Sequence, residues 1–157
     1  MVSIVTTYKD NKKYFLHYWL PLIYKHKEVE FIIIDNKSIS KPIVDYFPTD
    51  TKNLIVFGDK SLTGAISKAR NETVFITDIN CLPTYECMIT LDKYKGKNVM
   101  VQPRWHHYMQ NDFDNSICET SFSVLRDQYR KVKNKEEYIH QYSPEIIDKG
   151  HVYLVKD

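Results

Sequence analysis

Short runs of apolar and β-branched residues alternate with helical patterns along the first two-thirds of the chain. Runs with few charges are typical of strands buried on both faces. Between them, apolar residues such as Phe15, Trp19 and Leu22 recur at helical spacing. The pattern predicts strands at 2–7, 31–34, 54–57, 73–77 and 99–102, and helices at 11–27, 62–69 and 85–94, with Pro21 kinking or breaking the first helix. Strands that alternate with helices predict a largely parallel sheet with crossover connections.

The pattern loosens after Gln102, where we expect a strand at 121–125, a helical turn or two at 127–132 and a last strand at 152–155. A chain of 157 residues falls in the range of one domain. We therefore predict a single α/β domain over residues 1–157, with a mostly parallel sheet flanked by helices.

Composition narrows the classes of function only slightly. The net charge is +2 and the basic residues are spread along the chain, so charge does not favour a nucleic acid or membrane partner. Cys81, Cys87 and Cys118 lack paired-ligand spacing, which favours reduced thiols over a disulfide framework or a zinc site. The N-terminus has no signal-peptide pattern, and the apolar runs are too short to span a bilayer. We expect a soluble, cytoplasmic protein.

Polar residues follow three of the predicted strands: Thr7-Tyr8 the first, Asp35-Asn36 the second and Asp78-Ile79-Asn80 the fourth. In an open α/β sheet, ligands bind in the crevice beyond the carboxyl ends of the strands. Carboxylate and amide oxygens suit hard divalent cations. The Asp-x-Asn sequence therefore predicts a metal or phosphate site. The alternative is that Asp78 only caps the following turn, as Asx residues commonly do.

The order and spacing of these segments resemble the family 2 glycosyltransferases, which have the GT-A fold and use a nucleotide-diphosphate sugar. Thr6-Thr7-Tyr8, Asp35-Asn36-Lys37-Ser38 and residues 65–80 match the family's first strand end, second strand end and helix-turn-strand before Asp-x-Asp. Residues 121–126 and 132–137 are similar to a later strand with its arginine and the turn that follows. The chain departs from the family in having Asn80 as the second metal position and Asn71 in place of a turn glycine.

The resemblance implies a nucleotide-sugar-binding part at 1–105 and an acceptor-side part at 106–157. Asp78 and Asn80 would hold Mg²⁺ or Mn²⁺, which neutralises a leaving diphosphate. Asp35 would accept a hydrogen bond from the nucleotide base, and a uracil-type imide favours a UDP-sugar. Further contacts to the nucleotide would come from Thr7, Tyr8, Asn36 and, on a phosphate, Arg70.

Glu145 falls where the family places the general base of an inverting transferase, with Asp148 and Asp112 as alternatives. Trp105 and His106 offer an aromatic face and an imidazole for an acceptor sugar. The adjacent histidines His106 and His107 point to opposite sides of a strand, so at most one of the two faces the site. The alternative for Trp105 and His106 is a packed tryptophan with a surface histidine.

The leading prediction is metal-assisted, inverting transfer of a sugar from a nucleotide-diphosphate sugar to an acceptor glycan or another hydroxyl acceptor. A second hypothesis is a catalytically impaired relative that binds a nucleotide sugar or acts as a scaffold, which the single acid at the metal site favours. A nucleotidyltransferase ranks third, because residues 7–11 contain no glycine. A homo-oligomer is also open, since a short C-terminal region leaves apolar surface for a partner subunit.

Overall fold

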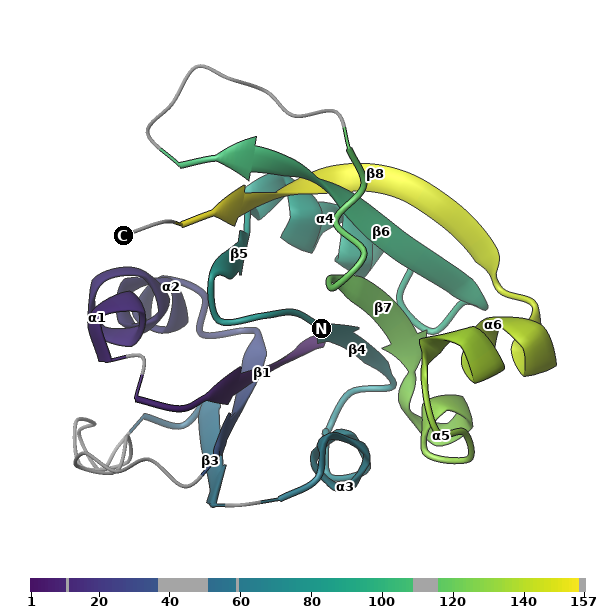
Figure 1. Ribbon diagram of the computed structural model, residues 1–157, viewed down its shortest axis with the longest axis horizontal. Helices are drawn as coiled ribbons and strands as arrows, with labels where there is room; N and C mark the ends of the chain where they lie inside the picture. The colour runs from purple at the N-terminus through teal and green to yellow at the C-terminus, as the bar shows by residue number, and fades with distance from the viewer. Residues whose placement is uncertain (11, 37–50, 59, 109–115, 156–157) are drawn as a thin grey trace.

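Two sheets with helices against them make up the computed structural model, which describes residues 1–10, 12–36, 51–58, 60–108 and 116–155 (Figure 1). The strands are β1 Ser3–Tyr8, β2 Glu30–Asp35, β3 Leu54–Gly58, β4 Thr73–Ile76, β5 Cys81–Pro83, β6 Val99–His107, β7 Phe122–Leu125 and β8 Glu145–Leu154. The helices are α1 Lys12–Tyr14, the π-helix η1 Phe15–Trp19, α2 Leu20–Lys25, α3 Leu62–Ile66, α4 Tyr85–Lys93, α5 Arg126–Tyr129 and α6 Lys135–Tyr142. Within these ranges, no helix is long and apolar enough to cross a membrane.

The main sheet has the strand order β3-β2-β1-β4-β7. β1 pairs in parallel with β2 and β4, β2 pairs in parallel with β3, and only β7 runs antiparallel, against β4. All six residues of β2 are buried, as expected for a strand covered on both faces. The mainly parallel α/β architecture predicted from the sequence is therefore confirmed.

Helices cover both faces of the main sheet, and the apolar core is divided accordingly. On one face, Phe15 and Trp19 of η1 pack against Phe31 and Phe75. On the other, side chains of α3, α5 and α6 pack against the alternate residues of the same strands. Because successive side chains of a strand point to opposite faces of the sheet, each apolar strand contributes side chains to both cores.

A second sheet, of order β5-β8-β6, lies beside the main one. β8 runs parallel to β6 and antiparallel to β5. The sequence predicted only the first part of β6 and the last part of β8, and it did not predict β5. These segments are short or interrupted by polar residues, so their extended form depends on pairing with distant strands rather than on a local pattern.

The predicted helix at 11–27 continues through Pro21 and changes type just before it. The N–H of Leu20 donates to the carbonyl of Phe15, which is the wider π spacing, and α2 then has Pro21 in its first turn. Proline has no N–H to donate to the preceding turn, so one backbone hydrogen bond is missing at Pro21 in either type of helix. A change of helix type at this point therefore costs no additional hydrogen bond.

Candidate functional site

The structure brings Asp35 and Asp78 to the same edge of the main sheet. Asp35 ends β2 and lies opposite Tyr8, the last residue of β1. On the other side of β1, the N–H of Thr77 donates to the carbonyl of Val5 at 3.0 Å, so Asp78 follows directly beyond that contact. β2 and β4 both neighbour β1, which places the two strands roughly 10 Å apart. The two aspartates therefore lie at the same edge of the sheet, where open α/β sheets bind ligands in a crevice beyond the strand ends.

Side chains at this edge differ in solvent exposure. Thr7, Asn36 and Asp78 are exposed, whereas Asp35 is 9% exposed. Tyr8 is 0% exposed, and its ring packs edge-on against Phe15 with centroids 6.0 Å apart. The expected contact between the Tyr8 ring and a nucleotide is thus corrected: the ring belongs to the core beneath η1, because alternation turns it toward that face of the sheet.

Backbone contacts fix the turn from Asp78 to Asn80. The carbonyl of Asp78 accepts from Cys81 N at 3.0 Å, that of Ile79 from Trp19 Nε1 at 2.6 Å, and that of Asn80 from Val155 N at 2.9 Å. Three separate elements therefore hold these carbonyls in place. Of the side-chain oxygens of this turn, those of Asp78 are exposed, whereas Asn80 Oδ1 accepts from the Cys81 thiol at 3.8 Å and would have to exchange this weak contact for a ligand.

These two side chains fit a cation that completes its shell from elsewhere. Over the described part of the chain, no group of three or more His, Cys, Asp or Glu side chains lies together to hold a metal ion. Mg²⁺ usually binds through one or two protein carboxylates, with waters and substrate phosphates as its other ligands. One carboxylate and one amide oxygen suit that mode of binding.

A buried polar cluster lies behind this turn and joins it to the segment before β7. Thr77 Oγ1 lies 2.7 Å from Ser121 Oγ, and the Cys81 and Cys118 sulfurs lie 4.0 Å apart. The contact between the sulfurs lowers the pKa of the Cys118 thiol to about 6 and raises the pKa of Cys81. Glu119 is exposed and belongs to the same segment. No sequence motif marks this carboxylate.

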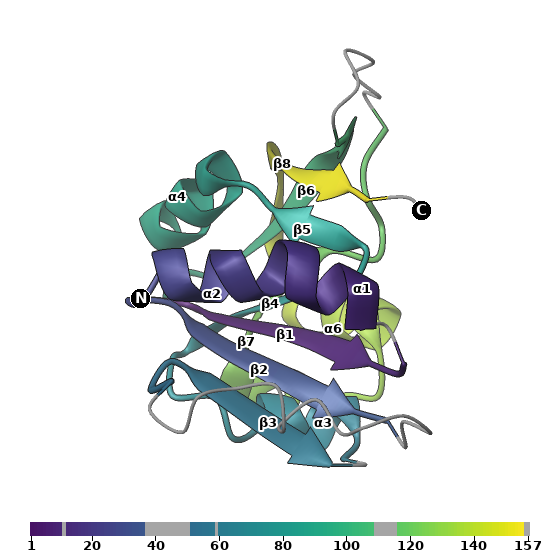
Figure 2. The same cartoon turned by 90° about the vertical axis from the view of Figure 1, so that its left-hand side faces the viewer.

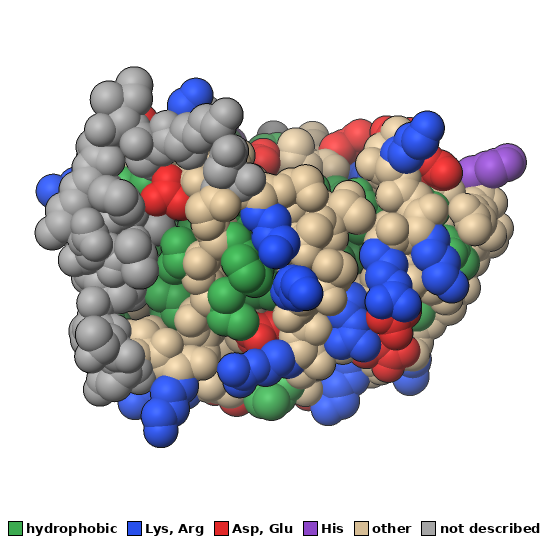
Figure 3. Space-filling view, turned by 90° about the horizontal axis from the view of Figure 1, so that it is seen from below, with side chains coloured by type: hydrophobic (Ala, Val, Ile, Leu, Met, Phe, Trp, Pro, Cys, Tyr) green, Lys and Arg blue, Asp and Glu red, His purple; other side chains and the backbone are tan. Residues whose placement is uncertain are grey.

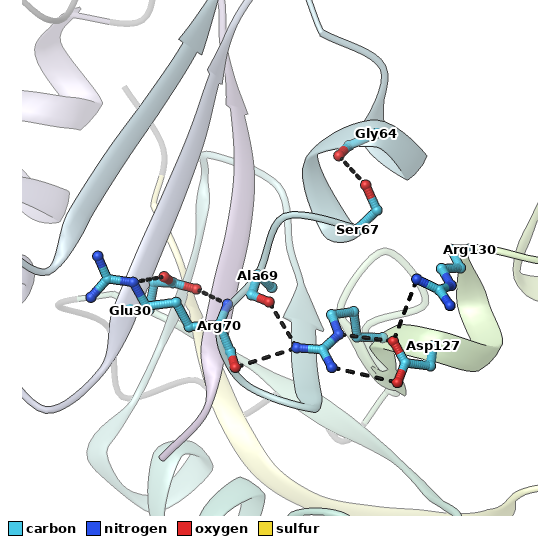
Figure 4. Close-up of polar contacts among 8 residues, drawn as sticks. Glu30, Gly64, Ser67, Ala69, Arg70, Asp127 and Arg130 are labelled. Carbon is cyan, nitrogen blue, oxygen red and sulfur yellow. Dashed lines mark hydrogen bonds and ion pairs between the residues drawn. The ribbon is translucent and has the colours of Figure 1, made fainter.

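Arg70 lies at the opposite edge of the sheet. Its Nε is 3.4 Å from Glu30 Oε2, and its backbone N–H donates to Glu30 Oε1 at 2.9 Å (Figure 4). Glu30 begins β2 and Asp35 ends it, a separation of roughly 17 Å along the strand. The expected role of Arg70 on a phosphate is therefore corrected, because a residue just before a parallel strand must lie at the amino edge.

Other cations near Arg70 are also held by protein groups. Arg126 donates to the carbonyl of Ala69 at 2.9 Å and pairs with Asp127 at 3.0 Å, and Arg130 lies 3.8 Å from Asp127 (Figure 4). The molecule seen from below carries many Lys and Arg side chains, with acidic side chains beside several of them (Figure 3). The hydrogen bonds and ion pairs of these arginines hold the loop before β4 and do not form an anion site.

Glu145 also lies away from the crevice. It begins β8 and pairs with Val99, whereas Leu154 at the other end of β8 pairs with Cys81. The two ends of β8 are nine residue steps, or roughly 30 Å, apart along the strand. The expectation that Glu145 is the general base is corrected on this geometry. Of its alternatives, Asp148 forms an ion pair with Arg104 midway along β8, and Asp112 lies outside the described residues, as do Lys37 and Ser38.

Trp105 and His106 point in different directions, as neighbouring residues of a strand do. The Trp105 indole donates to the carbonyl of Ile117 at 3.1 Å and packs against the core. The His106 ring lies 5.3 Å from that of Tyr153 and lines a cavity of about 590 Å³ between η1–α2 and β5–α4. Only His106 is therefore placed to meet a ligand in that cavity.

Comparison with solved structures identifies the fold. S. aureus TarS 1–349 aligns with a TM-score of 0.65 at 14% identity, over 98% of this chain and 60% of that one. The galactosyltransferase LgtC, solved with donor and acceptor sugar analogues, gives 0.52 at 15% identity, over 90% and 65%. The glycosyltransferase GlyE of Streptococcus pneumoniae TIGR4 gives 0.55 at 7% identity, over 94% and 44%.

No family model matches the sequence, and no curated protein matches it. The chain spans 60% of the length of TarS 1–349, the first of these structures. Likeness at such low identity establishes architecture and leaves the chemistry to the residues of the site. This chain has the GT-A-like α/β fold of these structures, with a mainly parallel central sheet and flanking helices.

Proposed function

We propose that this chain is a divergent glycosyltransferase, related to family 2, that transfers a sugar from a nucleotide-diphosphate sugar to an acceptor hydroxyl with the help of Mg²⁺ or Mn²⁺. One observation carries the proposal: Asp35 and Asp78 follow strands on either side of β1 and lie at the same carboxyl edge of the parallel sheet. The fold shared with LgtC, whose structure contains donor and acceptor sugar analogues, supports it.

Each residue of the crevice has a distinct part in this proposal. Asp35 accepts a hydrogen bond from the imide N–H of a uracil-type base, which favours a UDP-sugar. Thr7 and Asn36 are exposed beside it and line the same slot. Asp78 and Asn80 hold the divalent cation, which supplies positive charge opposite the diphosphate leaving group. Because Asn80 brings no charge, the affinity for the cation is weaker than that of a pair of carboxylates.

Inverting transfer also needs a carboxylate that removes the acceptor's proton. We assign this role to Glu119 in place of Glu145. Glu119 is two residues from Ser121, whose hydroxyl lies 2.7 Å from that of Thr77, the residue before Asp78. Its exposed position leaves the carboxylate open to solvent and to an acceptor.

The low negative charge of the turn from Asp78 to Asn80 favours a second function. Only one of its two candidate ligands is a carboxylate, and no further His, Cys, Asp or Glu completes a metal cluster among the described residues. A protein that binds the nucleotide sugar without turning it over would satisfy the same geometry. The two functions differ in the presence of transfer, not in the binding of the donor.

Calorimetric titration with UDP, with and without Mn²⁺, tests the proposal. We expect binding that Mn²⁺ strengthens, and an Asp78→Ala variant that loses most of that gain, at least about tenfold in Kd, or ~1.4 kcal/mol. Asp35→Ala should weaken binding both with and without the metal, because Asp35 contacts the base. Asp92→Ala is the matched control, since Asp92 is an exposed carboxylate that pairs with the N-terminus and Lys95.

The outcomes separate the two functions. UDP binding followed by hydrolysis or transfer of a UDP-sugar supports the enzyme. UDP binding without any turnover of UDP-sugars supports the binding protein. If UDP, GDP, ADP, CDP and dTDP all give flat titrations, both nucleotide-based functions are wrong.

A further inference from the structure

An open groove is lined by residues of the helix η1–α2 and of the edge formed by β5 and α4. Figure 2 shows these elements side by side. The groove's volume of about 590 Å³ is within the range of small-molecule sites. Of the residues assigned above to donor, metal or acceptor, only His106 lines it. Aromatic and imidazole side chains dominate its walls: Tyr18, Tyr85, Tyr108 and Tyr153 with His17, His26, His106 and His151.

One wall of the groove is a second face of the helix. The core face consists of Phe15, Trp19 and Ile23, each 0% exposed. The groove face consists of residues spaced at i, i+3, i+4, i+7 and i+8, which is one stripe of a helix: Tyr18, Pro21, Leu22, Lys25 and His26. The π-helical turn at η1 contributes Tyr18, and such turns occur frequently at functional sites. From residue 17 to residue 26 the helix rises roughly 14 Å, so the groove is elongated.

Aromatic rings of the opposite wall contact rings of the helix at both ends of the groove. At one end the Tyr108 ring lies 5.4 Å from that of Tyr18 and 5.6 Å from that of Tyr153, edge-on in both cases. At the other end the His26 ring stacks on Tyr85, with centroids 6.1 Å apart. Tyr108 is 40% exposed and Tyr85 is 66% exposed. These two rings thus present open faces to an occupant without supporting the core.

The chemistry of the lining fits a neutral sugar chain. Sugar rings have apolar C–H faces that pack on aromatic rings, and hydroxyl edges that hydrogen-bond to phenols and imidazoles. Lys25 and Glu86 balance in charge, and Glu86 is engaged by His151 Nδ1 at 2.9 Å. A phosphorylated occupant would require an excess of cations, which the lining does not supply.

A peptide fits the same groove poorly. Extended peptides commonly bind by adding a strand to the edge of a sheet. β5 is the edge strand here, it has three residues, and Pro83 among them has no N–H to donate. This edge therefore offers an added strand too few hydrogen bonds.

The groove begins beside the crevice. Leu82 lines it and pairs with Tyr153, and Cys81, the residue before Leu82, pairs with Leu154. Asn80 is the next residue back along the chain. We propose that this groove holds the acceptor as an extended neutral oligosaccharide of two or three units, with the end to be modified directed from Tyr108 and Tyr153 toward Asp78. The occupant's role as an acceptor rests on the proposed glycosyl transfer. The prediction that the groove binds a sugar does not depend on that function.

Binding of neutral trisaccharides tests the proposal directly. Maltotriose, cellotriose, chitotriose, mannotriose and xylotriose are tested one by one against the full chain by saturation-transfer NMR and calorimetry. We expect at least one to bind. Tyr85→Ala and Tyr108→Ala should each weaken that binding about three- to tenfold, which is the effect of losing one aromatic contact. The Kd for UDP should stay unchanged.

Tyr24→Ala is the matched control, because Tyr24 lies on the same helix α2, is 41% exposed and lines a separate depression. It should leave trisaccharide binding unchanged. The proposal is overturned if none of the five sugars binds, or if binding survives the combined Tyr85→Ala and Tyr108→Ala change. UDP binding without sugar binding contradicts the groove but not the transferase. Sugar binding together with flat titrations for UDP, GDP, ADP, CDP and dTDP contradicts the transferase and keeps the groove as a carbohydrate site.

Discussion

Asp78 contributes one carboxylate to the turn that follows β4, while Asn80 contributes only an amide oxygen. Because the backbone carbonyls of the turn already accept hydrogen bonds from Cys81, Trp19 and Val155, the turn cannot rearrange easily to recruit another ligand. A cation bound here depends on the charge of the diphosphate. Donor and metal should therefore bind cooperatively in the proposed enzyme.

Glu119→Gln is the sharpest test of catalysis at the level of single residues. If Glu119 is the general base, this change should lower the rate of transfer from a bound UDP-sugar by about 100-fold or more, because general base catalysis contributes that much. The Kd for UDP should not change. The rate is measured with saturating donor and an acceptor sugar.

Glu145→Gln serves as the control. Glu145 is exposed and lies at the far end of β8, so its amide should support the same rate as the wild type. A large loss of transfer in Glu145→Gln, with none in Glu119→Gln, would reverse the assignment.

The elements around the site depend on a few contacts between distant segments. α6 is an example: it begins at the cap Asn134, whose side chain accepts from Glu137 N at 2.9 Å. Its Tyr138 is 0% exposed and reaches β7, where Leu125 N donates to the phenol oxygen at 3.1 Å. The Tyr138 hydroxyl donates in turn to Gln128 at 3.3 Å. One side chain thus joins α6 to β7 and α5.

Tyr138→Phe should lower the free energy of unfolding at pH 7 by about 1–3 kcal/mol, because it leaves the buried Leu125 N–H without its partner. Burial raises the pKa of Tyr138 above its ordinary value of about 10. The folded state therefore favours the neutral phenol, whose contribution is complete below pH 10 and is lost as the pH rises through the folded pKa. Urea unfolding at pH 7 and above pH 10 should show the gap between wild type and variant shrinking.

Tyr24→Phe controls for general effects of removing a phenol, since Tyr24 is exposed. Its unfolding free energy should match the wild type within about 0.5 kcal/mol at pH 7. A gap for Tyr138→Phe that grows at alkaline pH would contradict the placement of this phenol.

At the scale of the whole molecule, the candidate site forms where the two sheets meet. The turn from Asp78 to Asn80 connects β4 of the main sheet to β5 of the second sheet. Ser123 Oγ of β7 accepts from Val101 N of β6 at 2.8 Å, which ties the sheets together from the other side. The relative position of the sheets therefore controls both the crevice and the groove.

Substitution of Gly150 tests how tightly α4 packs against β8. Its φ is +80°, and a Cβ at this position would lie 2.9 Å from Cys87 Cα of α4. Gly150→Ala should cost about 2–4 kcal/mol of stability, because the backbone conformation disfavours a side chain and α4 must move off β8. Urea unfolding measures this cost.

Gly58→Ala is the comparison, since a Cβ at Gly58 meets nothing within 4 Å. It should change the unfolding free energy by less than about 0.5 kcal/mol. Equal effects of the two substitutions would show that the contact between α4 and β8 is not tight.

Local sequence patterns were enough to predict the main sheet and the polar groups at its carboxyl edge. Continuous runs of β-branched residues are a local signal, so β1, β2, β3 and β4 lie within a few residues of the predicted ranges. The polar groups that follow β2 and β4 lie at the same edge because parallel strands must end together. The capping pair Asn134 and Glu137 was a further local signal, for α6, that the prediction did not use.

Contacts between distant segments determine which other residues lie near that edge. β8 runs parallel to β6, which carries Glu145 to the far end, and the return of the chain before β4 leaves Arg70 at the amino edge. Residues from four segments meet in the groove only after the second sheet forms beside η1 and α2. Such placements depend on strand order and direction, which are set by contacts between residues far apart in the chain and leave no local pattern in the sequence.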